Sequence, residues 1–279
     1  DRILKIGNKQ LAGVNISKEE VDKLIRGKRG SEVSFHIKRD SVELPMPIKA
    51  IRDQINVNSL DVAYMVEPTV GFVRIRRFGQ RTAEEFRTAI IDLKKQGAKN
   101  LILDLRDNGG GYFHVAIQLA GEFFSDSRLI VYTEGAHEKR REYHSEEGGK
   151  YAEGKLVVLV NERTASASEV VAGAIQDWDR GRIIGRRSYG KGIVQEQFDF
   201  PDGSSINLSI ARYYTPLGRS IQRKYNANWS NMVDYVSMYH GLWALDTLYA
   251  HGKAYKTGAG REVFSGGGIV PDLVIPADS

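Results

Sequence analysis

The chain of 279 residues contains no cysteine, which excludes disulfides, zinc–thiolate sites and cysteine nucleophiles. Exported proteins also do without cysteine, so this absence leaves the compartment open. No apolar run approaches 18 residues, and no transmembrane helix is expected. The net charge is only +5, and basic residues are scattered apart from small clusters such as Lys139–Arg141. This pattern favours solvated faces over a nucleic-acid surface.

The chain begins at Asp1 with the strand-like run DRILKIG, without an initiator methionine or signal peptide. We therefore expect a processed or trimmed product that has lost its targeting information. Residues 1 to about 48 are predicted to form a first α+β unit, in which Ser17 and Glu20 make a capping box before an amphipathic helix. The strand–helix–strand order resembles the C-terminal part of a PDZ domain. Its peptide-gripping loop and edge strand would then lie before Asp1.

From about residue 49 to residue 279, strands alternate with helices, which predicts an α/β core. An aromatic-rich segment at about 224–268 interrupts this pattern and is expected to be partly helical. The predicted strands are VGFVRIRRF, NLILDLRD, KLVVLV, GRIIG, IVQEQFDF and GIVPDLVIP, and the predicted helices are TAEEFRTAIIDLKKQG, capped by Thr82, then HVAIQLAGEFF and SASEVVAGAIQDW.

The stretch GRRSYGKGIVQ has the glycine and lysine spacing of a phosphate-binding P-loop. A P-loop also needs a Ser or Thr after the lysine and a helix behind it. Here Gly192 takes that position, and the following residues predict a strand. The sequence therefore argues against a nucleotide site, and Lys191 needs another explanation.

Ser166 falls where the strand KLVVLV gives way to a helix, so its hydroxyl could lie beside unpaired helix N–H groups. That is a suitable place for a nucleophile. Ser166 and Glu169 also satisfy the Ser-x-x-Glu capping box, and on this stretch alone the capping interpretation is favoured.

A serine nucleophile needs a partner that takes its proton. None of the six histidines has flanking residues that indicate catalysis. A lysine can serve if burial leaves it neutral, and Lys191 lies in a glycine-flanked turn that could aim its side chain. A surface lysine in a tight turn is the alternative. The run Gly109–Gly111 could present backbone amides to an oxyanion, or simply form a loop.

Together, the segments LDLRDNGGG, TASASE and YGKGIVQ resemble the signature segments of the C-terminal processing peptidases, serine peptidase family S41. GFVRIRRF, YYTPLGRSIQ and GIVPDLVIP also look like family segments and occur in family order. The resemblance implies a core like that of the crotonases and Clp-type proteases, preceded by the partial PDZ module. It implies Ser166 as nucleophile, Lys191 as general base and Gln195 as the residue that orients the lysine. It also implies Ala167 and Gly110, or its neighbour Gly111, as oxyanion donors.

Two features depart from the family pattern. Gly109 replaces the usual proline before the glycine pair, which should loosen the loop and could leave the oxyanion hole unformed at rest. The segment at about 224–268 is longer than in the family core.

The resemblance implies an endopeptidase that needs no cofactor or metal and cuts proteins near unstructured, apolar C-termini. It would be exported to a bacterial periplasm or cell envelope, and it could form homo-oligomers or bind an adaptor protein. The alternative is a pseudoprotease that binds chain ends without cutting them. A nucleotide-binding protein is a more distant third.

Overall fold

The computed structural model describes residues 1–53, 58–223 and 252–276 and divides the chain into two compact units, Asp1–Val57 and Asn58–Ser279. The boundary lies later than the one expected near residue 48. The reason is strand β5 (Ile48–Ile51), which pairs with β3 (Glu32–Arg39) of the first unit. Within the described ranges, no helix is long and apolar enough to cross a membrane.

The first unit is an antiparallel sheet with one helix. Strand order is β2-β1-β3-β4, and β5 pairs with β3. The helix α1 (Lys18–Ile25) begins at the predicted capping box and has no buried residue. The small core contains Ile6, Val33 and Ile37. The strands not yet bounded are β1 (Arg2–Ile6), β2 (Lys9–Gln10) and β4 (Val42–Glu43).

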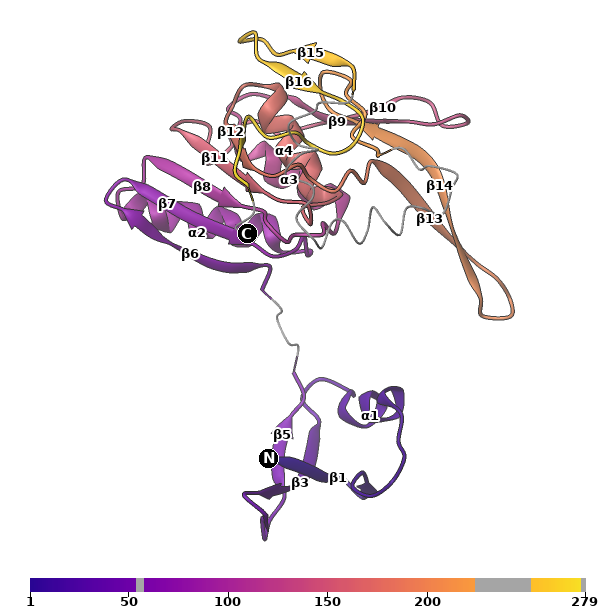
Figure 1. Cartoon of the computed structure of the whole chain (residues 1–279). Helices are drawn as coiled ribbons and strands as arrows, with labels where there is room; N and C mark the ends of the chain where they lie inside the picture. The colour runs from indigo at the N-terminus through magenta and orange to yellow at the C-terminus, as the bar shows by residue number, and fades with distance from the viewer. Residues whose placement is uncertain (54–57, 224–251, 277–279) are drawn as a thin grey trace. The chain divides into compact units, whose positions relative to one another are not determined.

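The second unit is built on a six-stranded sheet with the order β17-β12-β11-β8-β7-β6. Figure 1 labels all of these strands except β17. Every neighbouring pair is parallel except β6–β7. This arrangement confirms the predicted α/β core. The strands are β6 (Leu60–Glu67), β7 (Val70–Ile75), β8 (Asn100–Asp104), β11 (Leu156–Val160), β12 (Arg182–Gly185) and β17 (Leu273–Val274).

Three helices connect these strands: α2 (Thr82–Lys95), α3 (Phe113–Gly121) and α4 (Ala167–Asp177). Every residue of α4 is buried, because this helix packs against α3, β9 and β12. Thr82 is the first residue of α2 rather than its cap. The cap is Arg81, and the Thr82 hydroxyl accepts the Gly79 N–H.

A second, antiparallel sheet has the order β10-β9-β14-β13. Its strands are β9 (Leu129–Glu134), β10 (Arg141–His144), β13 (Ile193–Asp199) and β14 (Ser205–Tyr214). A separate hairpin pairs β15 (Ala254–Lys256) with β16 (Glu262–Phe264). The predicted aromatic-rich insertion falls mostly outside the described residues, and this hairpin occupies the part that is described.

The register of the parallel strands places three loops at one edge of the large sheet. Leu159 of β11 lies opposite Asp104 of β8, and Val160 lies opposite Gly185 of β12. The loops after β8, β11 and β12 carry the glycine run, Ser166 and Lys191, respectively. The carboxyl edge of a parallel sheet is where α/β proteins build their sites. The fold therefore explains why three segments far apart in sequence lie at the same edge of the sheet.

Candidate active site

Ser166 occupies a sharp strand-to-helix turn between β11 and α4. Its backbone has φ 58° and ψ −117°, an uncommon conformation for a residue with a side chain. Ala165 and Ala167 on either side are buried, whereas Ser166 is half-buried. Backbone strain of this kind persists only where the surroundings impose it, and in α/β-hydrolases it presents a nucleophile at the end of a sheet. The turn thus favours the nucleophile interpretation of Ser166.

Loop 109–111 lies directly against this turn. A Cβ on Gly110 would come within 2.8 Å of the Ala165 carbonyl oxygen and the Ser166 Cβ, so the close approach requires glycine. The Ala167 N–H finds no acceptor among the described residues and is available to an oxyanion.

The Gly110 N–H does not point to an oxyanion in this structure. It is donated to Asn108 Oδ1 at 2.9 Å, within its own loop. The Gly111 N–H has no acceptor within the described part of the chain. The loop therefore lies against the Ser166 turn, but the Gly110 N–H is bound to Asn108.

Buried Glu169 joins the turn at Ser166 to the loop that carries Lys191. Its Oε2 accepts the N–H groups of Ser166 at 2.8 Å and Lys191 at 2.9 Å. Its Oε1 accepts the Ser188 hydroxyl at 2.5 Å and the Gly190 N–H at 2.7 Å. Burial raises the pKa of Glu169, and these four donors oppose that shift. The capping-box pattern drew attention to this residue but gave no sign of its contacts with residues 188–191.

The Lys191 loop is also packed from its other side by the glycine turn at residues 266–268. Gly190 has φ 89°, and a Cβ on it would come within 3.0 Å of the Gly268 nitrogen. The Ile269 N–H donates to Ser188 Oγ at 2.6 Å, and Ser188 Oγ in turn donates to Glu169. Lys191 itself is half-buried. Its main chain is thus fixed from two directions.

Gln195 is not brought to Lys191. It is exposed on β13, and none of the described hydrogen bonds joins the two side chains. The prediction assumed an extended chain from Lys191 to Gln195. Instead, β13 begins only at Ile193, and a register shift falls between Val194 and Gln195. Because a bulge re-aims the side chains after it, the expected shared face is lost.

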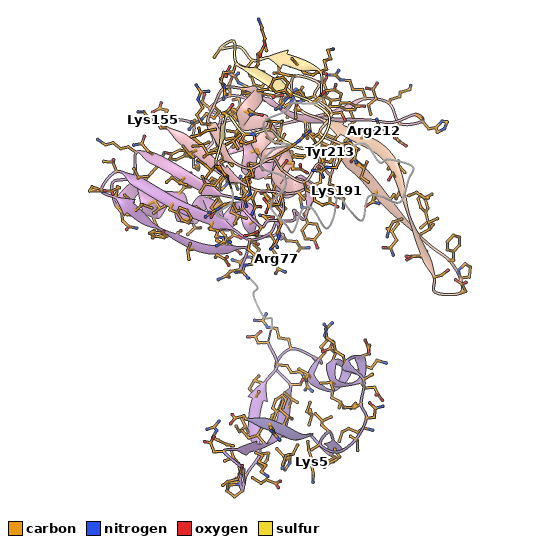
Figure 2. All side chains as sticks on the ribbon, viewed as in Figure 1. Lys5, Arg77, Lys155, Lys191, Arg212 and Tyr213 are labelled. Carbon is orange, nitrogen blue, oxygen red and sulfur yellow. The ribbon has the colours of Figure 1, made fainter. Side chains whose placement is uncertain are left out.

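Tyr213 of β14 is a site residue that the sequence did not single out, although YYTPLGRSIQ was noted as a family segment. Figure 2 labels it near Lys191. Its phenol donates to the Lys191 carbonyl oxygen. Burial raises the pKa of this phenol, and hydrogen bonding by the Ser166 side chain opposes that rise. A tyrosine in an alternating strand gives no local signal for such a contact.

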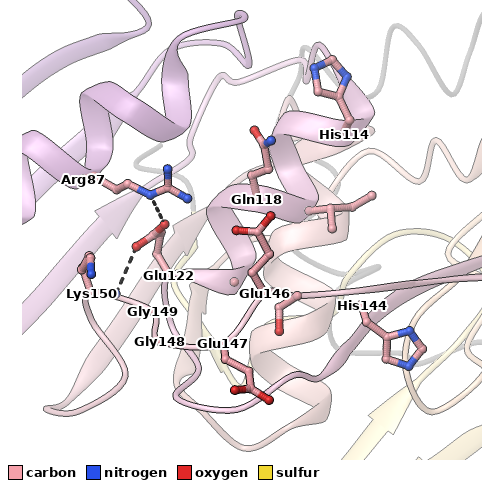
Figure 3. Close-up of a pocket in the computed structure, with 13 residues that line it drawn as sticks. Arg87, His114, Gln118, Glu122, His144, Glu146, Glu147, Gly148, Gly149 and Lys150 are labelled. Carbon is pink, nitrogen blue, oxygen red and sulfur yellow. Dashed lines mark hydrogen bonds and ion pairs between the residues drawn. The ribbon is translucent and has the colours of Figure 1, made fainter.

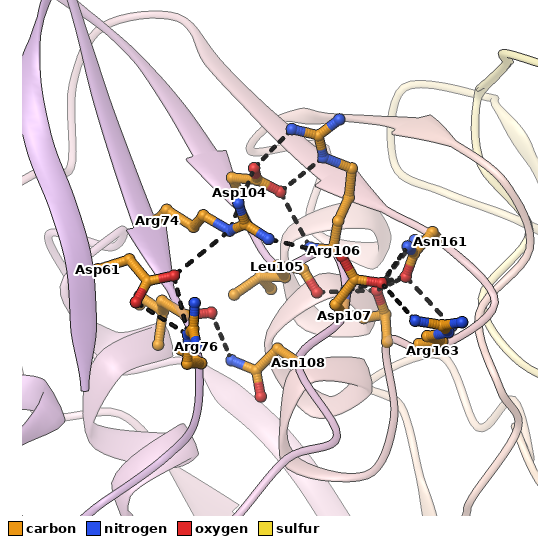
Figure 4. Close-up of polar contacts among 12 residues, drawn as sticks. Asp61, Arg74, Arg76, Asp104, Leu105, Arg106, Asp107, Asn108, Asn161 and Arg163 are labelled. Atoms are coloured by element: carbon orange, nitrogen blue, oxygen red, sulfur yellow. Dashed lines mark hydrogen bonds and ion pairs between the residues drawn. The ribbon is translucent and has the colours of Figure 1, made fainter. Parts of the chain in front are cut away.

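A polar network, shown in Figure 4, holds the loops after β8 and β11 together. Buried Asp104 binds Arg106 through both carboxylate oxygens, at 2.9 and 2.7 Å. Asn161 Oδ1 accepts the Asp107 N–H, and its Nδ2 donates to Asp107 Oδ1, both at 3.0 Å. The Asn108 carbonyl then accepts the Ala165 N–H at 2.9 Å. These bonds fix the loop at residues 109–111 relative to the turn at Ser166.

A pocket shown in Figure 3 lies elsewhere, between α3 and residues 144–150. Its Glu122 pairs with Arg87 and accepts the Lys150 N–H at 3.0 Å. None of the predicted catalytic residues lines it. Among the residues that the structure describes, no group of three or more His, Asp and Glu side chains could hold a metal ion.

The geometry agrees with comparisons to known proteins. The model of peptidase family S41 matches residues 69–227. A carboxyl-terminal-processing protease of Picosynechococcus sp. is 36% identical over 214 residues, which are 75% of this chain and 50% of that protein. A carboxy-terminal-processing protease of Bartonella bacilliformis is 37% identical over 226 residues, 80% of this chain and 51% of that protein.

A solved structure, the photosystem II D1 C-terminal processing protease, is 30% identical with a TM-score of 0.54. The match covers 79% of this chain and 60% of that one. The chain therefore spans about half the length of the curated relatives it matches.

Proposed function

The chain belongs to peptidase family S41, and from this premise we propose that it is a serine endopeptidase with a Ser166–Lys191 dyad. One observation supports the proposal most strongly. A single buried carboxylate oxygen, Glu169 Oε2, accepts the N–H groups of both dyad residues. This bond pair keeps a strained nucleophile turn and a base-bearing loop at a fixed spacing, which acyl transfer requires.

In the proposed reaction, Ser166 Oγ attacks the scissile carbonyl carbon while the neutral Lys191 amine takes the serine proton. The Ala167 N–H donates to the oxyanion, and the Gly111 N–H supplies the second donor, because the Gly110 N–H is donated to Asn108 Oδ1. The peptide C–N bond then breaks as Lys191 returns the proton to the leaving amine. Water attacks the acyl-enzyme with Lys191 again acting as base, and Ser166 is released. The cycle consumes one water and leaves the dyad unchanged.

A groove beside the Lys191 loop suits an extended peptide. Its volume is about 980 Å³, and its lining includes Ile193, Leu208, Ile210 and Arg212. The apolar side chains fit an apolar chain end, and Arg212 adds the positive charge that a terminal carboxylate would need. These contacts favour the cleavage of proteins near their C-termini. We further propose that the first unit is part of a PDZ module and that the protein acts after export to a bacterial envelope.

The proposal is tested by time-resolved cleavage of an unfolded protein with an apolar C-terminus. Samples quenched in acid and analysed by intact mass should show an acyl-enzyme on Ser166. Ser166→Ala should abolish both cleavage and adduct. Ser168→Ala removes a neighbouring hydroxyl that is buried and bonded to the Asn108 carbonyl, and it should cost less than about tenfold. Tight substrate binding by wild type without cleavage would instead identify a pseudoprotease.

A further inference from the structure

Tyr213 is fixed by its main chain as well as by its ring. It is 3% exposed, and its N–H donates to the Gly192 carbonyl oxygen at 3.0 Å. Its ring packs against Phe113, the first residue of α3, with ring centroids 6.2 Å apart. Tyr213 therefore lies between the Lys191 loop and the helix that follows the glycine loop.

The phenol of Tyr213 contacts the main chain of the Lys191 loop. Its single proton is donated to the Lys191 carbonyl oxygen. The Ser166 side chain acts on the same phenol, because its hydrogen bonding opposes the rise in the pKa of Tyr213. A hydroxyl that lowers the pKa of a phenol does so as the donor, with the phenol oxygen as acceptor.

Tyr213 is not a second general base. Burial raises its pKa well above the usual value, and the nearby Glu169 charge raises it further. The phenol thus keeps its proton throughout the working pH range, and the Ser166 proton has to go to Lys191.

We propose that Tyr213 is a positioning residue, which sets the Ser166 oxygen and the Lys191 main chain at a fixed spacing through one phenol oxygen. The inference rests on the proposed Ser–Lys chemistry. When Lys191 takes the proton, the serine hydrogen turns away from Tyr213 about the Cβ–Oγ bond. The ring packing and the bond to Lys191 hold the phenol in place meanwhile. No proton is gained or lost by Tyr213 in the cycle.

The experiment measures how fast the small probe diisopropyl fluorophosphate inactivates the enzyme. The probe forms an Oγ–P bond at Ser166 and releases fluoride, while the serine proton passes to Lys191. Tyr213→Phe removes only the phenol oxygen. Tyr151→Phe is the matched control, because Tyr151 is equally buried and its phenol donates to the carbonyls of Lys99 and Lys155 at the opposite edge of the sheet. The rate constant of inactivation is a property of the folded enzyme molecules, so a variant that is only partly folded does not lower it.

We expect Tyr213→Phe to slow labelling by about 10- to 100-fold, because a small misplacement of a nucleophile is costly. The Tyr151→Phe rate should stay within about threefold of wild type. In peptide cleavage, kcat should fall while KM changes little. Placing 4-aminophenylalanine at position 213 should restore part of the rate by returning a polar group to the ring.

Labelling of Tyr213→Phe at the wild-type rate would overturn the inference, and so would a loss that appears only in KM. A different result would contradict the proposed function itself. If wild type is labelled no faster than Ser166→Ala, Ser166 is not the nucleophile, and the inference about Tyr213 is also wrong.

Discussion

Two helices of this chain begin with the same Ser-x-x-Glu pattern, and the structure uses the two patterns differently. At α1, Ser17 has an ordinary extended backbone, and exposed Glu20 accepts the Ser17 N–H at 3.1 Å and no other N–H among the described residues. At α4, Ser166 has positive φ, and the carboxylate of buried Glu169 also binds the Lys191 loop. A local motif thus predicts where a helix starts. The tertiary surroundings decide whether its carboxylate also organises a site.

The pKa values of the two glutamates move in opposite directions. The Ser17 N–H lowers the pKa of Glu20, which is fully exposed. Burial raises the pKa of Glu169. Both glutamates accept the N–H of their cap serine, so the opposite directions of the two pKa shifts come from the burial of Glu169.

We expect the largest effect, a loss of activity, when Glu169 of α4 is replaced. Glu169→Gln keeps the side-chain size but replaces one acceptor oxygen with an NH₂ group that faces N–H donors. We expect kcat to fall by about 100-fold or more, because the nucleophile turn and the Lys191 loop lose their common anchor. Glu20→Gln, the matched change at α1, should leave kcat unchanged. Equal activity in the two variants would show that the Glu169 contacts are only structural.

A smaller effect is expected on the pH dependence of stability. The pKa of Glu169 is raised in the folded state, so between the ordinary value of 4.5 and the folded value the unfolded chain loses its proton first. The free energy of unfolding of wild type, relative to Glu169→Gln, should therefore fall as pH rises through this window and then stay constant. Urea unfolding at a series of pH values checks this. A relative stability that grows with rising pH would mean that the four donors outweigh burial.

The smallest effect is expected at the α1 cap. Ser17→Ala removes the hydroxyl that accepts the Glu20 N–H at 3.2 Å. The first unit should lose about 1 kcal/mol of stability, the typical value for a helix cap, with no change in cleavage rate of a short peptide. Hydrogen exchange of the α1 amides would report the loss. A large fall in peptide cleavage would contradict the separation of roles between the two caps.

The apolar runs of the sequence predicted the three helices and strands β7, β8, β11, β12 and β17 of the large sheet, because such runs are local features. Strand β6 of that sheet and strands β9, β10 and β14 of the second sheet were not predicted. The convergence of the three motif loops also follows from the alternation of parallel strands and helices. The bond from Gly110 to Asn108 and the bulge before Gln195 were not predictable, because each depends on a contact chosen within a folded loop or sheet. The Tyr213 contacts depend on how the second sheet lies against the first, which no local pattern records.

The roles assigned to Ser166, Lys191 and Gln195 and to the oxyanion donors Ala167, Gly110 and Gly111 remain predictions. In the structure, Glu169 accepts the main-chain N–H groups of both Ser166 and Lys191, and the Ala167 N–H has no acceptor among the described residues. The structure leaves Gln195 exposed and the Gly110 N–H bound to Asn108.

The central claim is that Ser166 and Lys191 work as one unit, and a double-mutant cycle tests it most directly. The rate of cleavage of an unfolded substrate is measured for wild type, Ser166→Ala, Lys191→Ala and the double variant. Residues that act together are not additive, so each single change should cost several orders of magnitude and the double variant should be little worse than either. Losses that multiply in the double variant would contradict the dyad.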